Sequence, residues 1–222
     1  MTAATQYRAV FFDFDGTLAN TEKLAVYATQ TAFAQMDLPI PTAAAIIQYQ
    51  GIPIETSFPL LAQDPMDQTT LQQLFTAFRS AYQAGESAET IQAFSGIPEL
   101  LTQLVAVGQQ LFLMTSKKSA VAQRNLAMLS LDKYFTAIYG SDRVVAYKPA
   151  PGGLQQALAE YQLSANEAVM VGDATFDIDA GNAAGMTTIA VTWGAHTQET
   201  LKQSEPDYLV ATREALAEVL YK

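Results

Sequence analysis

Six short runs of almost purely apolar residues are spaced along the chain, and they restrict its possible folds more than any other feature. These runs are nearly continuous in apolar character rather than alternating, which is typical of strands covered on both faces. They are Ala9–Phe14, Gln110–Thr115, Ala137–Gly140, Ala168–Gly172, Thr188–Thr192 and Tyr208–Val210. Segments with helical spacing separate them, the clearest being Ile97–Val107, Ser119–Leu129, Gly153–Tyr161, Phe176–Ala184 and Arg213–Leu220. This order predicts an α/β fold with a doubly wound, mostly parallel sheet.

The stretch from about residue 18 to about residue 92 interrupts the alternation. It contains no convincing strand, and Leu71, Leu74, Phe75, Phe78 and Tyr82 fall on one helical face. Prolines divide the stretch into about four helices. We therefore predict a helical domain of residues 18–92, inserted after the first strand of a core formed by residues 1–17 and 93–222.

Composition excludes several classes of protein. Half of the 222 residues are hydrophobic, which rules out a disordered chain. The formal charge of −10 disfavours a general binder of nucleic acid or anionic membranes. There is no cysteine, so disulfides and thiolate chemistry are excluded. The first apolar run is too short for a signal-peptide core or a membrane span, so we expect a soluble cytoplasmic protein.

The segment Asp13–Thr17, which reads DFDGT, follows the first predicted strand. Ligands bind at the carboxyl ends of the strands in open parallel sheets, and strand alternation would place Asp13 and Asp15 on one face. Two carboxylates held so close repel, and one takes up a proton or a cation. A simple turn explains Asp-Gly alone, but not this longer pattern after a buried strand.

A second acidic segment, Gly172–Asp177, ends another predicted strand and opens a helix. The helix dipole accounts for Asp177 in the first turn, whereas Asp173 directly follows the strand. If both strands are central, Asp13, Asp15, Asp173 and Asp177 converge on one crevice. Such a cluster is costly without a divalent cation, and hard oxygen ligands favour Mg²⁺.

Two further segments supply groups for an anion. Thr115 and Ser116 end one strand before a helix, where hydroxyls and free amides bind anions, although helix capping is the better explanation for them in isolation. Lys148 precedes Pro149, which restricts it to an extended conformation. A lone lysine is usually a surface residue, and only its combination with a carboxylate cluster makes a role in holding an anionic oxygen competitive. No P-loop, dinucleotide fingerprint or G-x-S-x-G segment is present, so a nucleotide cofactor and a serine hydrolase are unsupported.

In this order, the four motifs resemble those of the haloacid dehalogenase superfamily of phosphatases, with its Rossmann-like core. The resemblance spans Val10 to about Gly194, and the insert resembles the helical cap of the subfamily that contains phosphoglycolate phosphatase. Asp15 matches the phosphotransferase branch, because the dehalogenase branch lacks this second aspartate.

The resemblance implies a magnesium-dependent phosphatase that hydrolyses a small phosphomonoester. Asp13 would be the nucleophile that forms an aspartyl-phosphate, and Asp15 the general acid and base. Mg²⁺ would be held by Asp13, by the backbone carbonyl of Asp15 and by Asp173.

The remaining motif residues receive binding and supporting roles from the same resemblance. Thr115, Ser116 and Lys148 would bind the phosphoryl oxygens. The supporting residues would be Gly16, Thr17 and Asp177, the last of them orienting Lys148 or a metal-bound water.

Two other functions stay open. A phosphosugar mutase of the β-phosphoglucomutase type typically has a histidine in the cap, whereas the single histidine here, His196, lies outside the insert. A non-catalytic binding module would have lost a motif carboxylate or lysine, and none is missing. We therefore favour the hydrolase.

Partners follow from the same reasoning. We expect a small phosphorylated metabolite, neither nucleic acid nor membrane, and a monomer or weak dimer. Phosphoglycolate, sugar phosphates, nucleoside monophosphates and pyrophosphate are all candidate substrates. Lys23 and Lys117 are candidates for binding a carboxylate that the substrate carries in addition to its phosphate.

Overall fold

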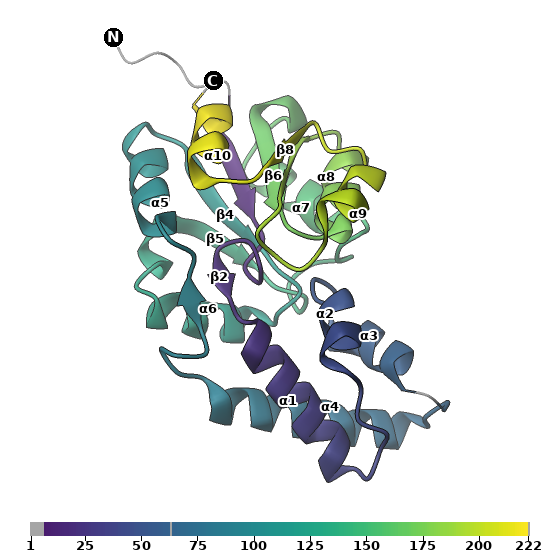
Figure 1. The fold of residues 1–222 in the computed structure, drawn as a ribbon. Coiled ribbons are helices and arrows are strands. Elements are labelled where there is room, and N and C mark those ends of the chain that lie inside the picture. The colour runs from purple at the N-terminus through teal and green to yellow at the C-terminus, as the bar shows by residue number, and fades with distance from the viewer. Residues whose placement is uncertain (1–6, 63, 222) are drawn as a thin grey trace.

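The computed structural model describes residues 7–62 and 64–221, and its centre is a six-stranded parallel sheet (Figure 1). The strand order is β5-β4-β1-β6-β7-β8. The strands are β1 (Ala9–Phe12), β4 (Gln110–Met114), β5 (Phe135–Tyr139), β6 (Ala168–Gly172), β7 (Thr187–Val191) and β8 (Tyr208–Val210). The predicted α/β fold is confirmed. Because β1 lies between β4 and β6, its carboxyl end is at the position where open sheets bind ligands.

Helices cover both faces of this sheet. On β1, Val10 and Phe12 belong to one buried cluster, and Ala9 and Phe11 to another. The first cluster is completed by side chains of α5 (Ile97–Ala106), α6 (Ser119–Met128) and α10 (Arg213–Leu220). The second is completed by α7 (Gly152–Glu160) and α8 (Thr175–Ala183). Burial on both faces is why the strands read as continuous apolar runs.

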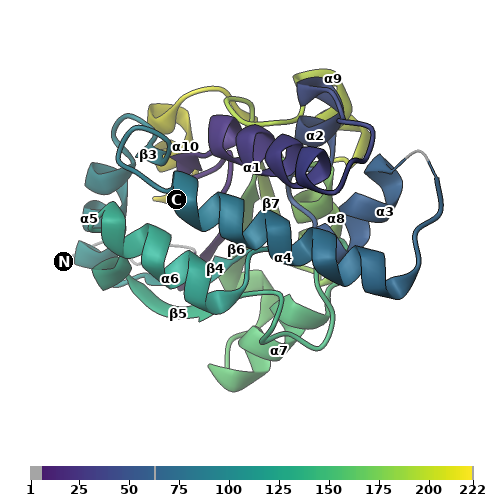
Figure 2. The ribbon, with the colours of Figure 1, turned by 90° about the horizontal axis from the view of Figure 1, so that it is seen from below.

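Residues between β1 and α5 contain a group of four helices, which we call the helical insert. They are α1 (Glu22–Gln35), α2 (Ala43–Gln48), α3 (Ile54–Leu61) and α4 (Gln68–Gly85). Phe33, Phe58, Leu74 and Phe75 form a small hydrophobic core within the insert. The view from below shows α1 and α4 lying side by side in front of the sheet (Figure 2).

The entry and exit of the insert are paired, which the sequence did not indicate. β2 (Ala19–Asn20) and β3 (Gln92–Ala93) form a short antiparallel ribbon, so the expectation of no strand in this stretch is wrong. Two-residue strands are too short to produce an apolar pattern. Leu18, Leu24, Ala81 and Ile91 pack into the main core cluster, which ties the base of the insert to the sheet.

Three short elements complete the fold and were not expected. They are α9 (Gln198–Gln203) and the 3₁₀ turns Asp132–Tyr134 and Ala165–Glu167. Among the described residues, none of the helices combines the length and the apolar character that a membrane crossing requires.

Candidate active site

A buried lysine joins two of the predicted carboxylates at the carboxyl end of the sheet. Lys148 Nζ lies 2.7 Å from Asp13 Oδ1 and 2.5 Å from Asp177 Oδ1. Asp13 directly follows β1, and Asp173 directly follows the adjacent β6. Oxygens of Asp13, Asp173 and Asp177 lie within 4.8 Å of one another. The first motif, at Asp13, therefore meets the third and fourth motifs, which lie more than a hundred residues further along the chain.

Burial shifts the proton affinities of this cluster. Loss of solvation raises the pKa of Asp13 well above its usual range. The charge of Lys148 opposes this shift, and the nearby carboxylates, Asp177 first among them, add to it. Burial, together with the charge of Asp177, raises the pKa of Asp173 to about 7. Burial alone would lower the pKa of Lys148, but the charges of Asp13 and Asp177 outweigh it and raise the pKa. The lysine is therefore a permanent cation beside carboxyls that resist full ionisation.

Asp173 sits in a cradle that only glycine allows. A Cβ on Gly16 would lie 2.1 Å from Asp173 Oδ2, and one on Gly194 would lie 2.2 Å from the same oxygen. Thr17 Oγ1 donates a hydrogen bond of 2.8 Å to Asp173 Oδ1, and the Ala195 amide donates one of 2.7 Å to Oδ2. This explains the glycine and threonine of the first motif in terms of positioning Asp173.

The donor set fits a hard divalent cation. Asp13 Oδ2 is buried and has no hydrogen-bond partner in residues 7–62 and 64–221. If Asp13, Asp173 and Asp177 are all ionised, their three negative charges and the one positive charge of Lys148 leave a net charge of −2. Oxygen-only ligands and two uncompensated charges suit Mg²⁺. Asp13, through its unpartnered Oδ2, and the neighbouring Asp173 would hold it. Both oxygens of Asp177 are engaged, Oδ1 with Lys148 and Oδ2 with the Ala174 amide.

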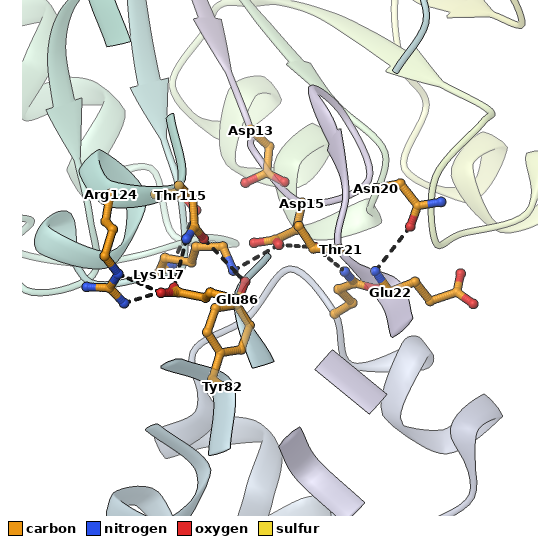
Figure 3. A network of polar contacts seen from close by, with 12 residues as sticks. Asp13, Asp15, Asn20, Thr21, Glu22, Tyr82, Glu86, Thr115, Lys117 and Arg124 are labelled. Carbon is orange, nitrogen blue, oxygen red and sulfur yellow. Dashed lines mark hydrogen bonds and ion pairs between the residues drawn. The ribbon is translucent and has the colours of Figure 1, made fainter. Parts of the chain in front are cut away.

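Asp15 lies apart from this cluster (Figure 3). Its Oδ1 is 2.9 Å from Lys117 Nζ and also accepts a hydrogen bond from Thr21 Oγ1. β1 ends at Phe12, two residues earlier than expected, so strand alternation does not extend to Asp15. The expected meeting of four carboxylates is therefore found for three of them. Asp15 is still close enough to raise the pKa of Asp13, after burial and the nearer carboxylates.

Lys117 connects Asp15 to the helical insert (Figure 3). Its Nζ donates a 2.7 Å hydrogen bond to Tyr82 Oη and lies 4.4 Å from the centroid of the same ring. Tyr82 then bonds Asn125 at 3.3 Å, and Asn125 bonds Glu86 at 2.8 Å. Burial raises the pKa of Tyr82 to about 12, so its hydroxyl stays protonated. A continuous polar chain thus runs from the first motif into α4.

The two hydroxyl residues of the second motif, Thr115 and Ser116, have different partners. Thr115 is buried directly after β4, and its Oγ1 accepts a 3.3 Å hydrogen bond from the Lys117 amide. Ser116 Oγ instead donates a hydrogen bond to the carbonyl oxygen of Gly51, in the α2–α3 loop. Of the two hydroxyls predicted to bind phosphate, that of Ser116 therefore holds the insert against the core.

Sequence reasoning missed several residues of this region. Thr21 was not singled out, and Lys117 received no settled role although it directly follows the second motif. His196 was noted only as a histidine outside the insert. Its Nδ1 accepts a 3.1 Å bond from the Thr175 amide, and its Nε2 lies 3.3 Å from the carbonyl oxygen of Gln48. His196 therefore links the fourth motif to the insert.

A cavity of about 160 Å³ lies between the insert and the sheet. Asp15, Ser116 and Lys117 form part of its wall on the core side, and side chains of α2, α3 and α4 form the wall on the insert side. Asp15 therefore borders a partly open space that is large enough for a small organic group.

Comparisons of the sequence with known proteins find phosphatases that match most of the chain. The chain is 34% identical over 208 residues to the probable phosphatase IndB of Dickeya dadantii, covering 91% of this chain and 89% of the relative. It is 29% identical to a phosphoglycolate phosphatase of Pectobacterium atrosepticum, covering 95% and 91% of the two chains.

A solved structure gives the same picture. A haloacid dehalogenase-like family hydrolase from Streptococcus pneumoniae superposes with a TM-score of 0.83 at 30% identity, covering 96% of this chain and 98% of that one. Residues 10–191 match the sequence profile of a family described as haloacid dehalogenase-like hydrolase. With the motif residues placed as above, the chain belongs to the haloacid dehalogenase-like hydrolase family.

Proposed function

We propose that this protein is a Mg²⁺-dependent phosphatase that hydrolyses a small phosphomonoester through an aspartyl-phosphate on Asp13. The strongest support is the buried Asp13 carboxylate, which is held by Lys148 through Oδ1 while Oδ2 has no partner in the described chain. One oxygen is thus fixed and the other is available to react. Relatives named as phosphatases support the same reaction class.

The first step replaces the phosphate ester by an acyl phosphate on Asp13. A carboxylate oxygen of Asp13 forms a bond to phosphorus as the bond between phosphorus and the alcohol oxygen breaks. Asp15 donates its proton to the departing alcohol. Lys148 and Thr115 would hold the phosphoryl oxygens, and Asp177 orients Lys148 through their 2.5 Å contact.

The second step restores the enzyme. Asp15 takes a proton from water, whose oxygen then attacks phosphorus and releases Asp13 and inorganic phosphate. Mg²⁺, held by Asp13, Asp173 and the backbone carbonyl of Asp15, would offset the repulsion between the carboxylate and the phosphate.

The insert would serve as a cap over the reaction. Residues 18–92 form this domain in our proposal, and residues 1–17 and 93–222 form the catalytic core. The contacts of Ser116 with Gly51 and of His196 with Gln48 support closure of the insert on the core. A closed cap excludes water from the site and selects the alcohol. A cytoplasmic location and a monomeric or weakly dimeric state stay predictions from the sequence.

Phosphate release from p-nitrophenyl phosphate, with Mg²⁺ and with a chelator, tests the proposal. We expect turnover only with Mg²⁺, and none for Asp13→Asn. Asp179→Asn is the matched control, because Asp179 is an exposed carboxylate on α8 beyond the cluster. Turnover by Asp13→Asn at the wild-type rate would contradict the role of Asp13, and turnover in the chelator would contradict the metal.

A further inference from the structure

The cavity between the insert and the sheet has a largely apolar wall. This wall includes Phe58, Phe78 and Tyr82 together with Ile52 and Val121. Phe58 and Phe78 meet edge to face with 5.2 Å between centroids, and Phe78 lies 5.7 Å from Tyr82. Aromatic rings that support one another in this way form a well-ordered apolar surface. Such a surface favours an apolar group over a hydrated one.

The arginines of the wall are already neutralised. Arg79 Nη2 lies 2.5 Å from Glu55 Oε1. The Arg124 guanidinium makes two hydrogen bonds, of 2.7 and 2.8 Å, to the carboxylate of Glu86. A bidentate pair of this kind leaves little charge for a ligand.

The lysines of the wall have partners as well. Lys117 binds Asp15 and Tyr82, while the exposed Lys118 lies close enough to Asp142 to interact with it electrostatically. Lys23, considered from the sequence for a second substrate carboxylate, is exposed and does not line the cavity. Within the described chain, every cation on this wall therefore has a nearby carboxylate.

The position of the cavity indicates which part of the substrate it receives. Asp15 forms part of its wall, and a general acid must lie within hydrogen-bond reach of the departing oxygen. The rest of the alcohol then extends into the cavity. An apolar cavity of about 150 Å³ is enough to bind benzene, so the 160 Å³ here accommodates a six-membered ring.

We propose that the preferred substrates are phosphomonoesters of neutral alcohols that carry an apolar, ring-sized group. This inference rests on the phosphatase function proposed above. A second anionic group, as in 2-phosphoglycolate, would meet apolar side chains and paired cations, and its desolvation would weaken binding.

Three esters of alcohols with similar basicity test the proposal: 2-phenylethyl phosphate, ethyl phosphate and 2-phosphoglycolate. With Mg²⁺, we expect kcat/KM for the phenylethyl ester to exceed that for the ethyl ester by about tenfold or more, mainly through KM. We expect 2-phosphoglycolate to be the poorest of the three. If 2-phosphoglycolate is the best, the proposed selectivity is wrong while the phosphatase function stands. If no ester releases phosphate, p-nitrophenyl phosphate included, both proposals are wrong.

A charge placed in the cavity gives an independent test. Ile52 lines the cavity, is half-buried and lies outside the hydrophobic clusters, so its substitution should spare the fold. Ile52→Lys adds a cation to the wall beyond those already paired, and it should raise the preference for 2-phosphoglycolate over the phenylethyl ester by about tenfold. Ile40→Lys is the control, since Ile40 is 57% exposed on the insert and away from the cavity.

The outcomes of this pair are distinct. An unchanged preference in folded Ile52→Lys would place the alcohol elsewhere and overturn the proposal. Should that variant unfold, Ile52→Ala provides the second measurement. It should raise KM for the phenylethyl ester about tenfold relative to the ethyl ester, and equal changes for both esters would contradict us.

Discussion

The ammonium nitrogen of Lys117 lies 2.9 Å from Oδ1 of Asp15. The lysine that directly follows the second motif therefore holds the second aspartate of the first motif in place. The contact fixes one carboxylate oxygen, and Oδ2 has no hydrogen bond within the described residues. A fixed carboxylate transfers protons more effectively than a mobile one, because it needs no reorientation during reaction.

Lys117→Met should therefore impair proton donation more than phosphate binding. We expect kcat for 2-phenylethyl phosphate to fall by about 10²-fold, with a smaller loss for p-nitrophenyl phosphate, whose leaving group needs little protonation. Steady-state kinetics on both esters measure the difference. The control is Lys133→Met, at an exposed position that does not line the cavity. Equal losses on the two esters would argue against a role in positioning Asp15.

Removing the charge of Asp13 should separate stability from activity. Burial disfavours the ionised form of this side chain, as its raised pKa shows. Without Mg²⁺, Asp13→Asn should raise the Tm by about 2–4 °C while abolishing turnover. Calorimetry in a chelator, together with a phosphate-release assay, checks both effects. A lower Tm would mean that the ion pair of Asp13 with Lys148 stabilises the fold by more than burial of the Asp13 charge destabilises it.

The buried carboxyl of Asp173 predicts a pH-dependent stability. Its pKa is about 7 in the folded chain because of burial and Asp177, against about 4 in the unfolded chain. The folded state holds this proton more tightly, so the stabilising effect is full below about pH 4 and is lost as the pH rises through 7.

The chelated protein should therefore have a higher Tm at about pH 5 than at about pH 8, and Mg²⁺ should raise the Tm more at the higher pH. Thermal unfolding with chelator and with Mg²⁺ tests this. Asp173→Asn should flatten the dependence of Tm on pH. If the slope of Tm against pH is unchanged in that variant, another titratable group causes the dependence.

Two glycines with positive φ offer a matched pair. Gly16 has φ +79° and would place a Cβ against Asp173, whereas Gly108 has φ +90° and would meet nothing within 4 Å. Both alanine variants should lose about 1–2 kcal/mol of unfolding free energy to backbone strain. Only Gly16→Ala should also lose activity and Mg²⁺ affinity, measured by kinetics and titration calorimetry. Comparable activity losses would mean that the strain alone is responsible.

Much of the fold was predictable because burial on both faces leaves a strong mark on a strand. Each of the six sheet strands overlaps an expected apolar run. β5 begins at Phe135, two residues before its expected start at Ala137, because residues of intermediate exposure at this edge weaken the pattern. The ribbon of β2 and β3 lay beyond such reasoning, since two residues carry no period.

The site was predictable where a motif directly follows a strand, and less so where the chain turns away. Asp13 and Asp173 occupy equivalent positions on adjacent strands, so their meeting follows from the topology. The pairing of Asp15 with Lys117 does not follow from the topology, because Lys117 lies 102 positions further along the chain. Its place immediately after Ser116 was the available signal.

The antiparallel ribbon at the base of the insert has a consequence for how this enzyme can diversify. Ala19 pairs with Ala93 and Asn20 with Gln92, so the chain leaves the sheet and returns to it at neighbouring points. The parts of the insert that do not pack into the main core can be lengthened, shortened or exchanged without moving either end. Recombination at this single junction could therefore give the same proposed reaction centre a new choice of alcohol, leaving the carboxylates of Asp13, Asp173 and Asp177 in place.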